Sequence, residues 1–369
     1  MKFNRMIMEK ESPEELGYDK IKYNLSESSI ADRRLSEVGM QIDNLLLFYG
    51  DHGGIPELRE VLGVQHYGLT DRDVLVCAGA CMSLFVVNAT LLSPRDRILV
   101  VQPNYATNIE VPKSLEIGTD LYKLSFDEGY RLDLDRLESM ITPATKLISV
   151  TYPHNPTGAM IDKGTLHALV LIAENHGIHL LVDETYRELT FGERLPPAAS
   201  LSKWAISVES VSKSYGVPGI RIGWIAIQDP DLMERFLATK EQIVICNSVV
   251  DEQIAYEVLK RRDNLLGMSR VKNEANFETL KTWMAGQELL EWVEPAGGVV
   301  CFPRFRNGVD VDLERFYRIL LDEYGAMVGR GRWFDEDDRY FRIGYGWPSH
   351  KELCGGLDAI SKAAGGSLR

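Results

Sequence analysis

The chain has 369 residues, of which 45% are hydrophobic and 26% are charged, and its formal net charge is −13. A chain of this length buries enough apolar surface for two or three structural units without disulfide or metal staples. The acidic balance argues against a nucleic-acid partner, which requires clustered Lys and Arg, but it does not exclude a local phosphate pocket.

The N-terminal segment MKFNRMIMEKESPEEL has charges in every apolar run, so we expect no signal peptide, and no later stretch predicts a membrane span. The five scattered cysteines do not fit a disulfide framework, which indicates a reducing compartment. We therefore expect a cytoplasmic protein.

Further along, Ser26 and Glu27 precede the segment IADRRLSEVG, and hydroxyl and acidic residues are favoured where a helix begins. The first interpretation of this pair is a helix N-cap.

From about Asp71 to Ile227, short β-branched runs alternate with longer amphipathic segments. This alternation is typical of a parallel sheet that crossover helices bury on both faces. The strand-like runs are, in chain order, VLVCAG, RILVVQP, KLISVTYP, HLLVDE, AISVESVS and GWIAIQ. We therefore expect an α/β fold with a large domain over residues 46–260.

After Asp229 the pattern becomes helical, and a long helical region extends to Gly286. From Leu289 onward short strand-like runs alternate with helical segments, which predicts a smaller α+β domain over residues 261–369. Residues 1–45 should form an N-terminal arm that belongs in part to this small domain. Because no linker rich in Pro, Gly and Ser separates the domains, they should be tightly coupled.

The segment SVESVSKSYGVPGIRIGW places Ser210, Ser212 and Lys213 after a strand-like run and Arg221 a few residues later. A lysine is normally a solvated surface charge, whereas a nucleophilic lysine needs a nearby cation or a desolvated pocket that lowers its pKa. The two hydroxyls and the guanidinium are donors that suit a phosphate group. The segment therefore predicts a phosphate site beside a reactive amine.

Two further polar motifs lie at the ends of strand-like runs. Asn155 follows one run in SVTYPHNPTGA, and Asp183 and Tyr186 follow another in HLLVDETYREL. In an open α/β sheet, ligands bind beyond the carboxyl ends of the strands. We therefore expect these side chains to converge with Lys213 in one site.

Together these motifs resemble the pyridoxal 5′-phosphate (PLP) site of the fold type I, class I/II aminotransferase family, over nearly the whole chain. The resemblance implies an enzyme whose large domain has a mostly parallel seven-stranded sheet. It implies that Lys213 carries the cofactor as a Schiff base and deprotonates the substrate Cα in the external aldimine. Asp183 would pair with the ring nitrogen, and Asn155 and Tyr186 would bind the ring oxygen, with Asn155 also facing the substrate.

The resemblance extends to other residues around the cofactor. Small residues in VCAGACMSLF let the backbone come close where a helix begins, so the amides of Ala80 and Cys81 are further predicted phosphate donors. Tyr105 matches the aromatic side chain that stacks on the ring. Cys77 and Cys81 are followed by no second pair of ligands, so no metal is expected.

Two residues indicate a partner subunit and a substrate contact. Tyr49 matches the tyrosine that reaches the neighbouring subunit's phosphate, which implies a homodimer, although a tyrosine that fixes the glycine-rich turn is equally compatible with the sequence. Arg342 matches the arginine that clamps the α-carboxylate of an amino acid. Since an N-terminal arm covers the site in this family, Ser26 and Glu27 are also candidates for the side-chain pocket, where Glu27 would pair with a guanidinium.

Several stretches are similar to the capreomycidine synthase branch, whose substrate is a hydroxylated arginine, and one to the PLP-dependent arginine oxidases. We therefore expect an enzyme that oxidises or cyclises arginine or an arginine derivative. An ordinary aminotransferase would instead pass the α-amino group to a 2-oxo acid, and a β-lyase would eliminate a side-chain group. A PLP-sensing transcription regulator would need a basic DNA-binding segment, for which we see no room before Tyr49.

Overall fold

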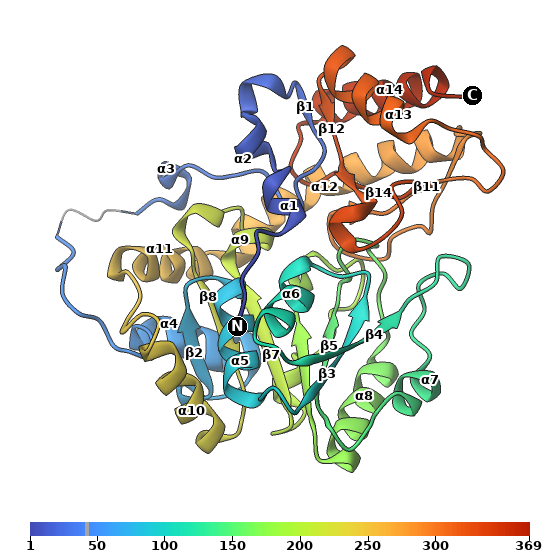
Figure 1. Cartoon of the computed structure of the whole chain (residues 1–369). Coiled ribbons are helices and arrows are strands. Elements are labelled where there is room, and N and C mark those ends of the chain that lie inside the picture. Colours follow the sequence, from blue (N-terminus) through green and yellow to red (C-terminus); the bar gives the residue numbers. More distant parts are fainter. Residues whose placement is uncertain (41–43) are drawn as a thin grey trace.

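A computed structural model describes residues 1–40 and 44–369 (Figure 1). Its central element is a seven-stranded sheet with the strand order β2-β8-β7-β6-β5-β3-β4. The strands are β2 (Val74–Cys77), β3 (Arg97–Gln102), β4 (Gly118–Lys123), β5 (Thr145–Thr151), β6 (His179–Asp183), β7 (Ala205–Ser210) and β8 (Gly223–Ala226). β8 is antiparallel to β2 and β7, and the other pairs are parallel. The predicted mostly parallel seven-stranded α/β sheet is confirmed.

Both faces of this sheet are covered by helices. Successive residues of a strand point to opposite faces, so Ile98 and Val100 of β3 pack with α5, α6 and α10, whereas Leu99 and Val101 pack with α7 and α8. The helices of this part of the chain are α4 (Pro56–Glu60), α5 (Ala80–Leu91), α6 (Ala106–Ser114), α7 (Leu134–Ser139), α8 (Lys163–His176), α9 (Val211–Ser214), α10 (Pro230–Glu241) and α11 (Val249–Lys260). Burial on both faces explains the continuous apolar runs.

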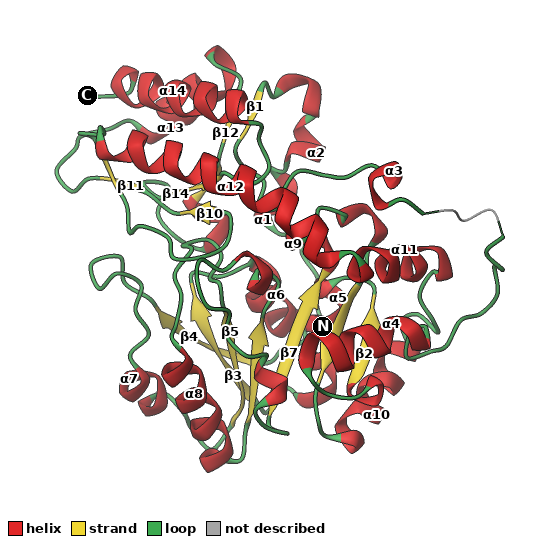
Figure 2. Cartoon of the chain, turned by 180° about the vertical axis from the view of Figure 1, so that it is seen from behind, coloured by secondary structure: helices red, strands yellow, loops and turns green. Residues whose placement is uncertain are grey.

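The C-terminal part of the chain has its own apolar core. Its helices are α12 (Arg262–Ala285), α13 (Leu313–Arg318) and α14 (His350–Gly366). Its strands are β9 (Leu290–Glu291), β10 (Val300–Cys301), β11 (Arg304–Phe305), β12 (Ala326–Met327), β13 (Gly329–Arg330) and β14 (Phe341–Gly344). Seen from behind, α12 runs from the sheet toward this second core and so connects the two parts of the fold (Figure 2).

The N-terminal arm lies against the second core. It contains α1 (Ile7–Lys10), α2 (Pro13–Leu16), β1 (Tyr23–Asn24) and α3 (Leu35–Val38). β1 pairs in parallel with β12, and Leu25 is fully buried among the residues of the second core. The domain boundaries inferred from the sequence remain a prediction. Within residues 1–40 and 44–369, no helix has the length and apolar character to cross a bilayer.

Candidate active site

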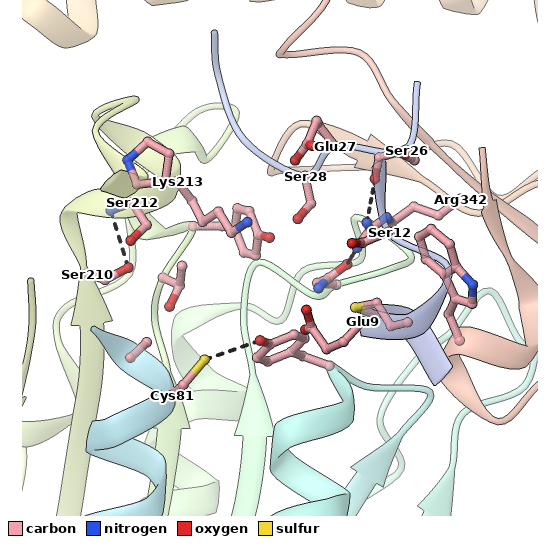
Figure 3. Close-up of a pocket in the computed structure, with 18 of the residues that line it drawn as sticks. Glu9, Ser12, Ser26, Glu27, Ser28, Cys81, Ser210, Ser212, Lys213 and Arg342 are labelled. Atoms are coloured by element: carbon pink, nitrogen blue, oxygen red, sulfur yellow. Dashed lines mark hydrogen bonds between the residues drawn. The ribbon is translucent and has the colours of Figure 1, made fainter. Parts of the chain in front are cut away.

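A cavity that is open to solvent lies beyond the carboxyl ends of β6 and β7 (Figure 3). Strand ends of the sheet, the N-terminal arm and β14 all contribute to its walls. It brings together every site residue expected from the sequence except Tyr49. These residues are Ser26, Glu27, Ala80, Cys81, Tyr105, Asn155, Asp183, Tyr186, Ser210, Ser212, Lys213, Arg221 and Arg342.

Lys213 enters the cavity from the short helix α9, which begins directly after β7. The Ser210 hydroxyl accepts a hydrogen bond from the Ser212 N–H at 3.4 Å and so caps this helix. The Ser214 hydroxyl donates to the Thr185 carbonyl at 3.0 Å, which ties α9 to the end of β6. The Lys213 carbonyl in turn accepts the Ile30 N–H at 3.2 Å. The lysine is thus held between the sheet and the arm.

Arg221 and the start of α5 form a cradle for an anion. The Arg221 Nη1 donates to the Ser212 hydroxyl at 3.3 Å and to the Pro218 carbonyl at 2.8 Å. Gly79 has a φ of 85°, which favours glycine, and a Cβ there would lie 2.4 Å from the Arg221 Nη2 and would displace the guanidinium. Gly79 also precedes α5 without a capping side chain, which leaves the first N–H groups of that helix to a ligand.

Asp183 is a buried carboxylate on the floor of the cavity, with 4% of its surface exposed. Its Oδ1 accepts the Thr185 N–H at 3.1 Å and the Thr185 hydroxyl at 2.6 Å. Burial raises the pKa of Asp183, and the hydrogen bonds from Thr185 only partly oppose this effect. A cationic N–H donor in the cavity would stabilise the ionised form.

Arg342, on β14, reaches from the second core to the sheet and the arm. It is 4% exposed. Its Nη1 donates to the Asn155 Oδ1 at 2.9 Å, and its Nη2 donates to the Ser26 carbonyl at 2.6 Å. Its Nε is buried and has no hydrogen-bond partner in the described part of the chain. Nη1 and Nη2 each carry a second N–H, which these two bonds leave for a bound anion such as a carboxylate.

Tyr105 lines the cavity and faces Cys81 at the start of α5. Its hydroxyl is 3.2 Å from the Cys81 Sγ (Figure 3). Burial raises the pKa of Tyr105 well above its ordinary value, so the phenol stays protonated at neutral pH. Its ring is half-buried and packs against the apolar core of the sheet, which leaves part of it to cover a planar ligand.

The sequence reasoning missed four polar residues of the arm that also line the cavity, namely Glu9, Ser12, Glu14 and Ser28. Glu14 accepts a hydrogen bond from the Tyr18 hydroxyl at 3.0 Å. Burial raises the pKa of Glu27, and Lys213 acts in the opposite direction. These residues could have been found from the sequence, because acidic residues cluster in an N-terminal arm that was already expected to cover the site.

Two expectations need correction or qualification. The interpretation of Ser26 and Glu27 as a helix N-cap is wrong, because no helix begins there and α3 starts only at Leu35. The Ser26 hydroxyl instead bonds the Asn24 Oδ1 at 2.7 Å, which turns this segment across the cavity. Tyr49 does not line the cavity of its own chain and is 81% exposed. Among the described residues, no group of three or more His, Cys, Asp or Glu is arranged to hold a metal ion.

Comparisons with known proteins agree with this geometry. The family model for aminotransferase class I and II matches residues 24–360. Capreomycidine synthase of Streptomyces vinaceus is 30% identical over 89% of this chain and 84% of its own length. An arginine–pyruvate transaminase of Pseudomonas aeruginosa is 31% identical over 50% of each chain. A PLP-dependent aminotransferase structure from Streptococcus suis has a TM-score of 0.92 and 29% identity, and the match covers 100% of both chains.

Proposed function

Since the chain belongs to the aminotransferase class I and II family, we propose that this PLP-dependent enzyme acts on arginine or an arginine derivative. The proposed reaction is of the oxidase or cyclase type. In the oxidase type, molecular oxygen accepts the two electrons and becomes peroxide. In the cyclase type, a side-chain nitrogen of a hydroxylated arginine forms the ring bond while the hydroxyl group leaves as water, with no net oxidation. Neither reaction needs a 2-oxo acid. The observation that carries the substrate proposal is the acidic lining formed by Glu9, Glu14 and Glu27. The similarity to capreomycidine synthase supports it.

The donor set of the cavity fits PLP. The hydroxyls of Ser210 and Ser212, the Arg221 guanidinium and the first amides of α5 (Ala80 and Cys81) suit its phosphate. The buried carboxylate of Asp183, whose pKa burial raises, suits a protonated ring nitrogen. When bound, PLP supplies an electron sink for the bond that breaks at the substrate Cα.

The other roles in the proposal follow from where each side chain lies. Lys213 holds the cofactor aldehyde and moves the proton at the substrate Cα. Asn155 and Tyr186 bind the ring oxygen, and Tyr105 packs on the ring. Arg342 binds the α-carboxylate with the N–H groups that remain free on Nη1 and Nη2, while its bond to Asn155 keeps the substrate and cofactor contacts in one network.

The acidic lining favours a cationic substrate side chain. Glu27 and Glu14 both lie close enough to Lys213 for its charge to lower their pKa values, so the three groups share one space. With the cofactor bound to its nitrogen, Lys213 would no longer present a free ammonium as a counter-charge to these carboxylates. A guanidinium would supply it again and would accept bidentate pairing with a carboxylate. We assign Ser26 and Glu27 to this side-chain pocket.

The proposal includes a homodimer. Tyr49 lies in an apolar segment whose side chains point to solvent, with Leu46 71%, Leu47 75% and Phe48 59% exposed. A contiguous apolar surface of this kind is typical of a protein interface. In the proposed dimer, the partner subunit's Tyr49 completes the phosphate site.

Ordinary transamination is the second candidate. The observation in its favour is the similarity to an arginine–pyruvate transaminase over half of the chain. Transamination would use the same cavity and the same substrate class as the first proposal. It differs because it needs an oxo acid, which returns the cofactor to its aldehyde form.

The test is an assay of the PLP-reconstituted protein with arginine, citrulline, aspartate and alanine, each with and without pyruvate or 2-oxoglutarate, under air and under nitrogen. Consumption of arginine without an oxo acid supports the oxidase or cyclase proposal, and peroxide formed only under air identifies the oxidase. Consumption that requires the oxo acid supports transamination. Turnover of aspartate or alanine in preference to arginine would overturn the substrate proposal.

A further inference from the structure

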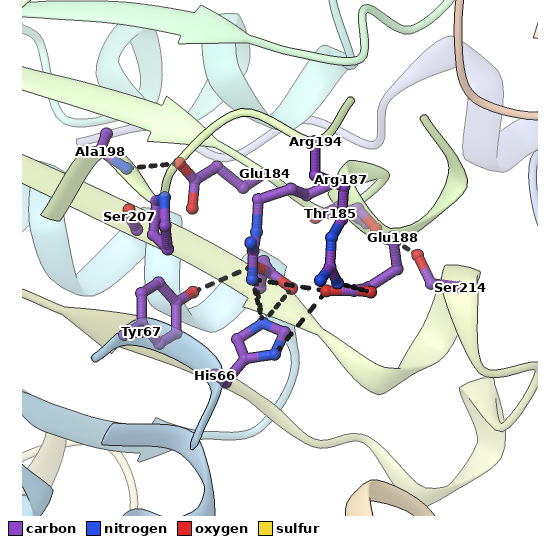
Figure 4. Close-up of polar contacts among 12 residues, drawn as sticks. His66, Tyr67, Glu184, Thr185, Arg187, Glu188, Arg194, Ala198, Ser207 and Ser214 are labelled. Atoms are coloured by element: carbon purple, nitrogen blue, oxygen red, sulfur yellow. Dashed lines mark hydrogen bonds and ion pairs between the residues drawn. The ribbon is translucent and has the colours of Figure 1, made fainter. Parts of the chain in front are cut away.

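A buried cluster of charged and polar side chains takes no part in the roles assigned above (Figure 4), although several of its members are sequence neighbours of residues that line the cavity. We call it the charge cluster. Its members are His66, Tyr67, Glu184, Arg187, Glu188 and Glu209. All six are at most 8% exposed, so none of the charges is solvated in the ordinary way. Burial of this many charges is costly unless they compensate one another.

Glu209, in β7, is the centre of the charge cluster. Its Oε1 lies 3.0 Å from the Arg187 Nε and 3.0 Å from the His66 Nε2. The Tyr67 hydroxyl donates to the same oxygen at 3.2 Å. Burial opposes ionisation of Glu209, but His66 and Arg187 outweigh it and lower the pKa of Glu209 to about 2. The carboxylate is therefore charged at every working pH.

The charge cluster is supplied by distant parts of the chain. His66 and Tyr67 come from a π-helical segment, Val61–Tyr67, and such segments are rare and frequently found at functional sites. Trp224 of β8 donates from its Nε1 to the Tyr67 hydroxyl at 2.9 Å. Arg187 lies in the 3₁₀ turn Arg187–Leu189 that follows β6. The ion pair between Arg187 and Glu209 thus joins the segment after β6 to β7.

The members of the charge cluster alternate along the chain with residues of the cavity. Glu184 follows Asp183, Arg187 follows Tyr186, and Glu209 precedes Ser210. Glu209 and Ser210 both belong to β7, where neighbouring side chains point to opposite faces, so Ser210 lines the cavity while Glu209 enters the charge cluster. The other two pairs lie at the end of β6 and in the turn that follows it. The cluster therefore holds the backbone at the same positions that carry the proposed cofactor contacts.

Stability alone gives a weak account of this arrangement, because an apolar replacement of a buried ion pair is often neutral or stabilising. We propose that Arg187 and Glu209 are positioning residues, which hold the strand end carrying Asp183 and Tyr186 at a fixed place relative to the one carrying Ser210 and Lys213. This inference rests on the proposed cofactor site and is independent of the proposed substrate.

The experiment compares Glu209→Gln and Arg187→Met with the wild-type protein after reconstitution with PLP. Visible circular dichroism per bound PLP reports the orientation of the ring, and titration with PLP gives its dissociation constant. Glu291→Gln is the matched control, because Glu291 pairs with the largely buried Arg304 at 2.8 Å and does not line the cavity. Thermal unfolding of each apoprotein measures the structural cost.

We expect both cluster variants to lose at least about half of the visible dichroism and to bind PLP roughly tenfold more weakly, because small displacements of positioned groups have large effects. Glu291→Gln should lower Tm but leave both cofactor readouts unchanged. If either cluster variant fails to fold, the double variant Arg187→Met/Glu209→Leu, which removes both members of the ion pair together, replaces it. That variant should recover Tm but not the dichroism.

The inference is overturned if Glu209→Gln behaves as Glu291→Gln does, with a lower Tm and unchanged cofactor readouts. It is equally overturned if the double variant recovers the dichroism together with Tm, since the pair would then serve packing alone. Failure of the substrate proposal looks different. In that case arginine is not consumed by the wild-type protein, while the cluster variants still lose dichroism.

Discussion

Replacement of Glu27 by Gln tests how the candidate site selects its substrate. The change keeps the size of the side chain and its hydrogen-bonding capacity but removes the negative charge in the cavity. If a guanidinium pairs with this carboxylate, kcat/KM for arginine should fall. Citrulline, in which an uncharged ureido group replaces the guanidinium, provides the comparison within the same variant.

The expected magnitude follows from the half-buried position of Glu27, where burial already opposes ionisation. A hydrogen bond to a charged group contributes about 1.5–3 kcal/mol. At about 1.36 kcal/mol per factor of ten, kcat/KM for arginine should fall roughly 10- to 150-fold. The value for citrulline should change little, because no charge pair is lost.

The assay measures kcat/KM for both substrates across pH. Since burial raises the pKa of Glu27, its charged form appears only as the pH rises through that pKa, and kcat/KM for arginine should increase over the same range. The increase should be absent in Glu27→Gln and present in Glu60→Gln, a change on the exposed surface of α4. An equal loss for arginine and citrulline, or no loss for either, would refute the reasoning.

Three further predictions concern the cofactor cradle, the buried carboxyls and the proposed interface. Gly79→Ala should weaken PLP binding roughly tenfold or more, because the added methyl group clashes with Arg221. In the control Gly219→Ala, the added methyl group has no atom within 4 Å, so PLP binding should not change. Titration with PLP measures both dissociation constants. Burial raises the pKa of Glu184 to about 8, so its contribution to apoprotein stability is lost as pH rises from the ordinary value of 4.5 toward 8. Glu184→Gln should flatten this dependence in Tm measured from pH 5 to pH 8. Phe48→Glu should convert a dimer to monomer in analytical ultracentrifugation, and an unchanged sedimentation coefficient would contradict the proposed interface.

The sheet was predictable because its strands are buried on both faces and so read as continuous apolar runs. β4 was not singled out, because it lies at the edge of the sheet and its sequence, GTDLYK, has no such run. Its residues are mostly only half-buried, and a polar edge strand cannot be told from a loop by pattern alone.

The strand-end residues were predictable for a related reason. Asn155, Asp183 and Ser210 each follow an apolar run, and parallel strands bring their carboxyl ends together at one edge. The contribution of the arm was only partly predictable, because its contacts depend on tertiary pairing between β1 and β12 and not on local pattern. The same pairing explains why residues 26–29 are not helical although their composition suits a helix start.

The charge cluster shows what a sequence pattern leaves out. Glu209 interrupts the apolar run AISVESVS, and a charge within a buried strand is itself a signal. Its partners Arg187 and His66 are 22 and 143 residues away in sequence, so their identity required the fold.

The central claim is that Lys213 carries the cofactor, and it can be measured without knowledge of the substrate. The PLP-reconstituted protein is reduced with borohydride, digested and mapped by mass spectrometry. The account predicts a phosphopyridoxyl group on the peptide that contains Lys213, and its absence from a Lys213→Ala variant. A phosphopyridoxyl group on a different lysine, or none on a protein shown to be folded, would contradict the account.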